Sequence, residues 1–271
     1  MNNDETDGDI GSLLAPVTAL ARTAGERILE VYNSDDYAVE EKDDRTPLTA
    51  ADLASHHTIV DGLGRLTPGI PILSEESSSL PYDERARWRR YWLVDPLDGT
   101  REFINRNGEF TVNIALIEDG VPVLGVVHVP VTGVSYSACR GRGAFKQTGD
   151  ARPDPIRVRR LDGGPVMVVG SRSHRGKSLN DFLAKLGAHE LVGMGSSLKL
   201  CLVAEGIADI YPRLGPTSEW DTAAAQCIVE QAGGHVTDTG MQPLRYNTKD
   251  SLLNPYFLVF GDAGRDWSRY L

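Results

Sequence analysis

Apolar residues recur at helical spacing near the start of the chain. Over residues 10–32 they lie three or four positions apart, which predicts a helix. Residues 49–66 predict a second helix, with Thr49 as its N-cap and Asp52 three positions later, as in a loose capping box. The chain is therefore expected to begin with two helices.

The pattern then changes to short apolar runs separated by turn residues. Apolar side chains alternate along residues 110–117, so that Val112 and Ile114 share one face. Glu-Asp-Gly at 118–120 supplies a turn before the next run, which is typical of an antiparallel meander. Helices before and after such a meander are expected to pack on its faces. Strands are predicted at 72–73, 91–94, 110–117, 123–129 and 134–139.

Around residues 151–164 the composition shifts to Pro, Gly and Arg, and beyond this segment strands and helices alternate. We therefore expect a disordered acidic tip over 1–9, an α+β metal-binding half over 10–160 and an α/β substrate-binding half over 161–271. The cleft between two such halves is a natural place for a site. In the second half, strands are predicted at 166–169, 208–211 and 257–260, and helices at 178–186, 197–204 and 222–232.

Composition and charge exclude several classes of protein. The 271 residues include 28 basic and 38 acidic side chains, a formal net charge of −10, whereas nucleic-acid binders carry a basic face. The three cysteines are odd in number and far apart, which favours free thiols in a reducing cytosol over disulfides or a zinc site. No signal-peptide pattern is evident, and the apolar runs are too short to span a bilayer. We expect a soluble, cytoplasmic protein that acts on a small molecule.

Acidic side chains are grouped in three separate segments. Glu75 follows the first short strand, and segment 95–100 (Asp-Pro-Leu-Asp-Gly-Thr) follows the second. In that segment Pro96 is expected to end the strand, and Gly99 permits a positive φ. Asp221 opens a predicted helix. Crowded carboxylates repel one another and need a cation, and hard oxygen ligands favour Mg²⁺, Mn²⁺ or Ca²⁺ over zinc.

Each segment also has an explanation without catalysis. The aspartates of 95–100 can bond backbone amides in a turn, the Glu pair at 75–76 can be a solvated surface, and Asp221 can cap a helix. The occurrence of all three segments together favours a metal site. A haloacid-dehalogenase-type phosphatase is not favoured, because its Asp-x-Asp-Gly-Thr motif has one residue between the acids, whereas Asp95 and Asp98 are separated by two.

Segment 95–100, paired with Trp-Asp-Thr-Ala-Ala-Ala at 220–225, resembles the signature of the lithium-sensitive, magnesium-dependent phosphatase superfamily that includes inositol monophosphatase and fructose-1,6-bisphosphatase. The resemblance runs from about Asp52 to Asn254 and implies a layered αβαβα sandwich, the sugar phosphatase fold. Within the superfamily the chain is most similar to the 3′(2′),5′-bisphosphate nucleotidase branch of the CysQ type. The segments that carry this similarity are 92–103, 107–114, 195–199 and 211–213.

The resemblance also implies a cofactor and its ligands. Two or three Mg²⁺ ions are implied, with Mn²⁺ as a substitute and Li⁺ and Ca²⁺ as inhibitors. Asp52 matches the carboxylate of a further, weaker metal, although a residue that complements the helix dipole fits equally well. The implied metal ligands are Glu75, Asp95, the Leu97 carbonyl, Asp98 and Asp221.

Substrate contacts are implied on both sides of the expected cleft. Lys199 and Arg213 are cations that could bind a second phosphate in an otherwise acidic protein. Without the resemblance, Lys199 would be a solvated helix residue and Arg213 the partner of a nearby glutamate. The residues implied to contact substrate are Glu75, Leu97, Asp98, Gly99, Thr100, Ser171, His174, Ser196, Lys199, Arg213 and Asp221.

The expected reaction is hydrolysis of a phosphate monoester without a covalent intermediate, because no Ser-His or Cys-His pair is evident. Activated water would attack phosphorus in line between metals about 3.5–4 Å apart. Thr100 would orient that water, and Glu75 or Asp52 would take its proton. The substrate phosphate would rest on the amides near Gly99.

The expected substrate is adenosine 3′,5′-bisphosphate, converted to AMP and phosphate, with its sulfated analogue as a second substrate of sulfur assimilation. The resemblance also allows a peripheral location on the cytoplasmic side of the inner membrane, although no amphipathic anchor is evident. Two alternatives stay open: hydrolysis of inositol phosphates by the same residues, and a catalytically silent domain that binds cations or nucleotides.

Overall fold

The computed structural model describes residues 9–33, 39–41, 47–171 and 177–271, with the backbone alone at 39–41 and 47–49. The expected acidic tip lies outside the described residues except for Asp9. The Asp9 side chain accepts a hydrogen bond from the Gly11 amide at 3.1 Å and pairs with Arg142 at 2.5 Å. The predicted N-cap role of the Thr49 side chain also lies outside what is described.

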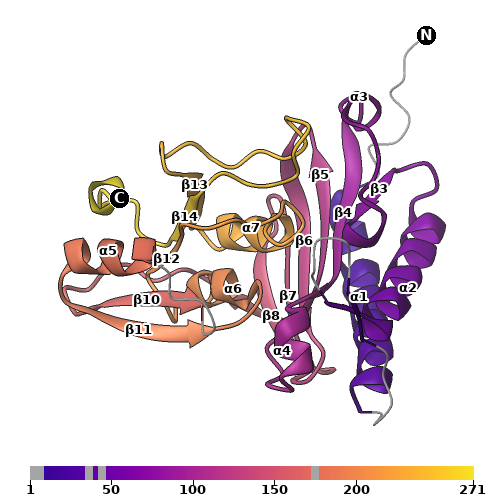
Figure 1. Cartoon of the computed structure of the whole chain (residues 1–271), viewed down its shortest axis with the longest axis horizontal. Helices are drawn as coiled ribbons and strands as arrows, with labels where there is room; N and C mark the ends of the chain where they lie inside the picture. The colour runs from indigo at the N-terminus through magenta and orange to yellow at the C-terminus, as the bar shows by residue number, and fades with distance from the viewer. Residues whose placement is uncertain (1–8, 34–38, 42–46, 172–176) are drawn as a thin grey trace.

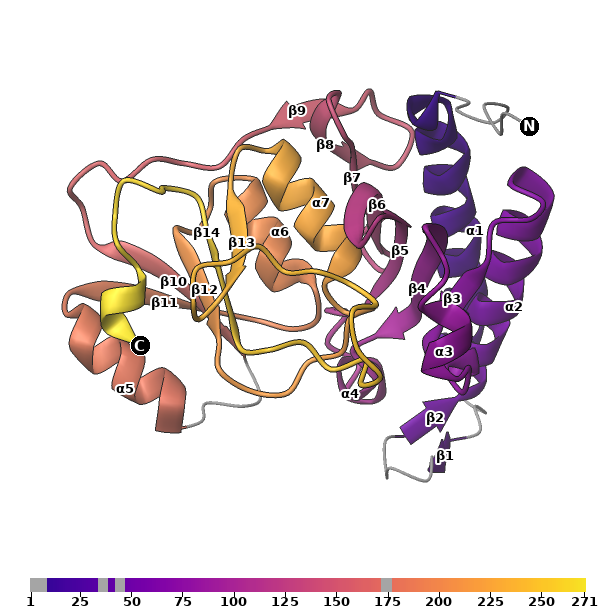
Figure 2. The ribbon, with the colours of Figure 1, turned by 90° about the horizontal axis from the view of Figure 1, so that it is seen from above.

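Two β-sheets and three layers of helices stack in the order α, β, α, β, α (Figure 1). Helices α1 (Leu14–Tyr32) and α2 (Ala50–Leu66) cover the outer face of a seven-stranded sheet. Helices α6 (Leu198–Ala204) and α7 (Ala223–Gln231) lie between the two sheets, and α5 (Lys177–Leu186) covers the far face of a five-stranded sheet. Figure 2 shows the same layers from above. The layered sandwich implied by the resemblance is confirmed.

The seven-stranded sheet is the predicted meander, extended at both ends. Its order is β3-β4-β5-β6-β7-β8-β9, with β3 parallel to β4 and every later pair antiparallel. The last two strands were not predicted, and the prediction that the second strand ends at Asp95 is wrong. The strands are β3 (Ile72–Ser74), β4 (Arg90–Asp98), β5 (Thr111–Glu118), β6 (Val121–Val129), β7 (Val134–Cys139), β8 (Gly143–Thr148) and β9 (Asp154–Ile156).

The five-stranded sheet has the order β11-β10-β12-β14-β13. Strand β10 runs parallel to both of its neighbours, whereas β14 is antiparallel to β12 and β13. Two of these strands, β11 and β13, were not predicted. The strands are β10 (Val166–Ser171), β11 (His189–Met194), β12 (Ile210–Arg213), β13 (His235–Asp238) and β14 (Phe257–Phe260).

Short elements complete the chain. A two-stranded antiparallel sheet precedes α2, and single helical turns follow β3 and β4. The two-stranded sheet and the turns were not predicted, because segments of three to five residues show no clear periodicity. These elements are η1 (Ile10–Leu13), β1 (Val39–Glu41), β2 (Pro47–Thr49), η2 (Glu75–Ser77), α3 (Tyr82–Arg85), α4 (Thr100–Ile104) and η3 (Ser268–Tyr270).

Strand β5 separates two hydrophobic cores. Val112 and Ile114 pack in the core shared with α1 and α2, whereas Ala115 and Ile117 pack in the core shared with α6 and α7. The predicted alternation is therefore confirmed, although both faces of the strand are buried. Helices α6 and α7 come after residue 161, yet they pack on the seven-stranded sheet of the first half. The division of the chain into two halves at residues 160 and 161 stays a prediction.

A glycine allows α7 to approach the first sheet closely. A Cβ atom on Gly125 of β6 would lie 2.2 Å from the carbonyl oxygen of Ala224 in α7. No side chain other than hydrogen fits at that distance, so Gly125 sets how deeply α7 packs.

All three cysteines, Cys139, Cys201 and Cys227, are buried free thiols, as predicted. Among the described residues, no helix is both long and apolar enough to cross a bilayer.

Candidate active site

A bulge in β4 places Asp95 and Asp98 on the same face of the sheet. Asp95 pairs with Asn113 and Asp98 pairs with Thr111, so three steps along β4 match two steps along β5. In a regular strand, residues three apart point to opposite faces. The extra residue removes that difference, and a bulge also accommodates Pro96, which has no N–H to donate.

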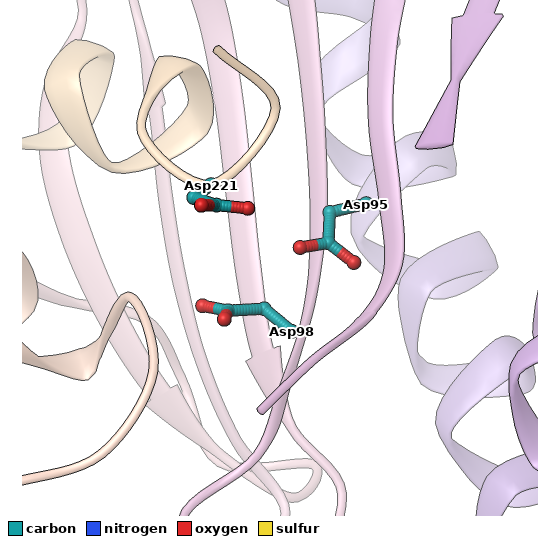
Figure 3. Close-up of side chains that lie close together, drawn as sticks. All are labelled: Asp95, Asp98 and Asp221. Carbon is teal, nitrogen blue, oxygen red and sulfur yellow. The ribbon is translucent and has the colours of Figure 1, made fainter. Parts of the chain in front are cut away.

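Asp221 reaches the same place from the turn before α7. Figure 3 shows its carboxylate facing those of Asp95 and Asp98, and ligand atoms of the three lie within 4.8 Å of one another. The Asp221 carboxylate accepts a hydrogen bond from the Ser218 amide, at 3.0 Å, upstream of the helix. The N-cap of α7 is Thr222. The helix-cap explanation of Asp221 is therefore wrong.

Burial and mutual repulsion perturb these carboxyl groups. Burial raises the pKa of Asp95 well above its ordinary value, and the charges of Glu75, Asp98 and Asp221 add to the effect. Burial likewise raises the pKa of Asp221 to about 8, with Asp98 and Glu75 contributing and the Ser218 amide opposing. Such a cluster favours a nearby cation, and carboxylate oxygens suit a hard divalent ion.

Helix α2 supports the acidic cluster from behind. Ser55 donates a hydrogen bond to the carbonyl of Pro96 in the bulge, at 2.7 Å. His56 Nδ1 lies 2.9 Å from Ser74 Oγ, directly before Glu75. Asp52, in the first turn of α2, is 1% exposed, and its charge contributes to the raised pKa of Asp95. That proximity fits a metal-site residue, while its place in the first turn still fits a dipole partner.

The backbone turns sharply after Asp98. Gly99 has φ 94° and precedes Thr100, the first residue of α4, so the predicted positive φ is confirmed. A Cβ at Gly99 would lie 3.3 Å from Glu102 Oε2, which adds crowding to the backbone strain. The side chain of Leu97 is buried in the core with α1 and α2, and its amide donates to Asp95 Oδ1 at 3.0 Å. The metal role of its carbonyl stays a prediction.

A cavity of about 150 Å³ opens beside the aspartates and is lined from both halves of the chain. Most of the residues expected to bind substrate line it, and His174 lies outside the described residues. Eight lining residues were not predicted to contact substrate. Two of them, Arg101 and Glu102, directly follow segment 95–100, a position that could have indicated them. The residues lining the cavity include Asp98, Arg101, Glu102, Ser171, Ser196, Lys199, Tyr211, Arg213, Thr217 and Asp221.

Two of the three cationic side chains that line this cavity, Lys199 and Arg213, are held in place. Lys199 is 8% exposed, so it is not a solvated surface lysine; its Nζ donates to the Ser196 carbonyl at 2.5 Å. Burial lowers the pKa of Lys199, and the charge of Asp98 opposes that shift. Arg213 donates to Thr217 Oγ1 at 2.5 Å and to the Pro216 carbonyl at 2.7 Å. Among the described contacts, a turn and not a glutamate holds its guanidinium.

This arrangement can be compared with known proteins. A model of the inositol monophosphatase family matches residues 9–259. The chain belongs to the inositol monophosphatase family. It is 52% identical over 248 residues to the 3′(2′),5′-bisphosphate nucleotidase CysQ of Escherichia coli (strain K12), covering 91% of this chain and 99% of that protein. The corresponding CysQ of Salmonella typhimurium is 53% identical over 250 residues, with the same coverage.

Solved structures of the family share the fold. CysQ from Bacteroides thetaiotaomicron superposes with a TM-score of 0.81 at 42% identity, covering 93% of this chain and 97% of that one. Inositol monophosphatase from Anabaena gives a TM-score of 0.77 at 27% identity, covering 97% and 96%. The fold is therefore shared by a CysQ protein and an inositol monophosphatase, so it does not by itself identify a substrate.

Proposed function

We propose that the chain is a 3′(2′),5′-bisphosphate nucleotidase, which hydrolyses adenosine 3′,5′-bisphosphate to AMP and phosphate. The observation that carries the proposal is a cluster of three carboxylates beside a cavity that is also lined by the cations Lys199 and Arg213. Carboxylates suit a divalent ion at the reacting phosphate, and cations suit a second phosphate. The names of relatives more than half identical to the chain support the same substrate.

Magnesium is the proposed cofactor, with two or three ions per site and Mn²⁺ as a substitute. The site fits such an ion because its donors are oxygens and because burial, together with repulsion, raises the pKa of Asp95 and Asp221. Bound divalent ions would polarise the phosphoryl oxygens and acidify water. The proposed ligands are Glu75, Asp95, the Leu97 carbonyl, Asp98 and Asp221.

Side chains and backbone amides of the chain would bind the substrate and activate the attacking water. The amides after Gly99 would hold the reacting phosphate, the Thr100 hydroxyl would orient the attacking water, and Glu75 or Asp52 would take its proton. Lys199 and Arg213 would bind the phosphate that does not react. Ser171, Ser196 and His174 are further proposed contacts on the nucleotide side.

In the cell, such an enzyme would remove a by-product of sulfate assimilation, with the sulfated analogue of the bisphosphate as a second substrate. We propose inhibition by Li⁺ and Ca²⁺ and a cytoplasmic or peripheral inner-membrane location, as the family resemblance implies.

The deciding experiment measures phosphate release with Mg²⁺ from adenosine 3′,5′-bisphosphate and from myo-inositol 1-phosphate, with EDTA as the control. We expect kcat/KM for the bisphosphate to be higher by roughly 10²-fold or more, because two cations can each contribute charge-assisted hydrogen bonds. A preference for the inositol phosphate would indicate the alternative hydrolase. Magnesium binding without turnover of either compound would indicate the silent domain.

A further inference from the structure

The side chain and the peptide that follow Gly195 hold one oxygen of Asp98. Ser196 Oγ donates a hydrogen bond to Asp98 Oδ2 at 2.7 Å, and the Ser197 amide donates to the same oxygen at 2.5 Å. Two donors on one oxygen fix the rotation of a carboxylate. A segment of the second half therefore determines how a candidate metal ligand of the first half is oriented.

Ser196 is itself fixed by a buried set of hydroxyl groups. Thr111 Oγ1 lies 2.5 Å from Ser196 Oγ and 2.9 Å from Ser197 Oγ, and Ser197 donates to Asn113 Oδ1 at 2.9 Å. Thr111 is 0% exposed and Asn113 is 1% exposed. A hydroxyl has one hydrogen to donate. Thr111 Oγ1 also donates to Asn113 Oδ1 at 3.1 Å, and the Ser197 amide donates to Ser196 Oγ at 2.6 Å. Ser196 gives its own hydrogen to Asp98, and these buried neighbours hold its oxygen in place.

The other polar group of Ser196 contacts the cation of the cavity. Its carbonyl accepts a hydrogen bond from Lys199 Nζ at 2.5 Å. Ser196 therefore bonds Asp98 through its hydroxyl and Lys199 through its carbonyl. Its backbone has φ 52°, a conformation with little freedom for a residue with a side chain, so a shift of the peptide moves both contacts.

We propose that Ser196 is a positioning residue that couples Lys199 to Asp98, so that an anion bound at Lys199 changes how tightly Asp98 holds a divalent cation. The coupling rests on the proposed function, because it assigns the non-reacting phosphate to Lys199. A bound phosphate attracts the ammonium group of Lys199 and so weakens its hydrogen bond to the Ser196 carbonyl. Relaxation of that bond reorients the Ser196 hydroxyl and, with it, the Asp98 carboxylate.

The positioning role can be tested with Mn²⁺ alone, measured as free Mn²⁺ by electron paramagnetic resonance. Ser196→Gly removes the hydroxyl and suits the positive φ, so it adds no backbone strain. We expect Mn²⁺ affinity to fall by about 10- to 100-fold, the usual effect of losing a group that orients a metal ligand. The matched control is Ser135→Ala, which removes a buried hydroxyl bonded to His128 at 2.9 Å.

We expect the Ser135→Ala protein to bind Mn²⁺ as the wild type does. Wild-type affinity in the Ser196→Gly protein would overturn the positioning role, and so would an equal loss in both variants, which would indicate general destabilisation. This experiment uses no nucleotide, so its result is independent of the proposed substrate.

The coupling is tested by repeating the titration with AMP, whose 5′-phosphate is the proposed ligand of Lys199. We expect AMP to tighten Mn²⁺ binding to the wild type by about 5-fold or more, and Mn²⁺ to tighten AMP binding by the same factor. The factor should fall toward 1 in Ser196→Gly and in Lys199→Met. An unchanged factor in Ser196→Gly, or no effect of AMP on the wild type, would overturn the coupling. The proposed function is tested separately, by measuring phosphate release from adenosine 3′,5′-bisphosphate.

Discussion

Asp98 has contacts on both sides of the candidate site. It lies with Asp95 and Asp221 in the acidic cluster, lines the cavity, and accepts hydrogen bonds from Ser196 and Ser197. The Asp98 carboxylate thus belongs to the acidic cluster, and residues of the second half of the chain orient it. The same residue was expected from the sequence as a metal ligand, but the donors that orient it were not.

Asp98→Asn should reduce turnover by roughly 10²–10³-fold, the size seen when one group that stabilises charge in a transition state is lost. Folding should change little, because the substitution removes one anion from a crowded cluster. The measurement is kcat for phosphate release together with the thermal midpoint. Asp119→Asn, at a surface ion pair with Arg89, is the control. Activity within about twofold of wild type would remove Asp98 from the site.

Lys199→Met keeps most of the apolar stem and removes the charge. A hydrogen bond to a charged group contributes about 1.5–3 kcal/mol, so kcat/KM for the bisphosphate should fall by roughly 10- to 150-fold. The loss for 3′-AMP, which has no second phosphate, should be much smaller. Lys146→Met, whose lysine pairs with Glu205 at 2.5 Å, is the control. Equal losses with both substrates would contradict a role in binding the second phosphate.

At the level of secondary structure, two irregular positions in the backbone, a bulge and a glycine, place the carboxylates of the candidate site. The bulge between Asp95 and Asp98 puts two carboxylates on one face, and Gly99 lets the chain leave β4 for α4. The sequence predicted a turn at this place because Pro and Gly stand there. It did not predict that the strand continues through Pro96, because pairing with β5 is a long-range interaction that local pattern does not contain.

Gly125→Ala should displace α7, because the new methyl group would meet the Ala224 carbonyl. We expect unfolding to require about 1–3 kcal/mol less, the usual effect of overpacking. Half-maximal activity should need more Mg²⁺, since Asp221 lies in the turn directly before α7. Urea unfolding and Mg²⁺ titration of activity measure the two effects.

The matched control for this glycine is Gly64→Ala in α2, where a Cβ would have no neighbour within 4 Å. Alanine in that helix should stabilise the protein by up to about 1 kcal/mol. Equal stability of Gly125→Ala and the wild type would show that the close approach does not position α7.

At the level of the whole molecule, the site exists because two sheets share one middle layer of helices. Asp95 and Asp98 come from the seven-stranded sheet, while Asp221 and Ser196 come from segments before α7 and α6, and Lys199 lies in the first turn of α6. The packing of those helices on the sheet concentrates negative charge in a partly buried place. This charge makes the stability of the molecule depend on pH and on divalent ions.

The metal-free protein should lose stability as pH rises from 6.5 to about 8. Burial and repulsion raise the pKa of Asp95 and Asp221, the latter to about 8, so the native state binds more protons than the unfolded chain, and their stabilising effect is lost as pH rises. Below pH 6.5 the opposite contribution of His128 enters, since burial lowers its pKa to about 4. Thermal unfolding in EDTA measures the trend.

Magnesium should raise the thermal midpoint most at the upper end of this range, because a cation stabilises the ionised carboxylates. Asp221→Asn should flatten the pH dependence. A midpoint in EDTA that rises between pH 6.5 and 8 would contradict the raised pKa values.

The order of amino acids was enough to indicate the long helices, the central strands, the family, the three aspartates of the acidic cluster, and Lys199 and Arg213 in the cavity. These features follow from periodicity and from short motifs such as segment 95–100, in which neighbouring residues carry the information. The three acidic segments could be named as a group, and their occurrence together favoured a metal site, but the distances between their side chains could not be derived from local pattern. Strands β8, β9, β11 and β13 lie at or next to a sheet edge and are largely part-exposed, so polar residues or glycine interrupt the apolar run that marks the other strands.

Only the folded chain showed which groups contact one another across the two halves. The distances from Ser196 to Asp98 and from Lys199 to Ser196, and the burial that changes pKa values, depend on the packing of residues far apart along the chain. Such contacts arise because packed apolar layers exclude water, so that buried polar groups form hydrogen bonds with one another. The sequence contains the partners, but the tertiary structure selects the pairs.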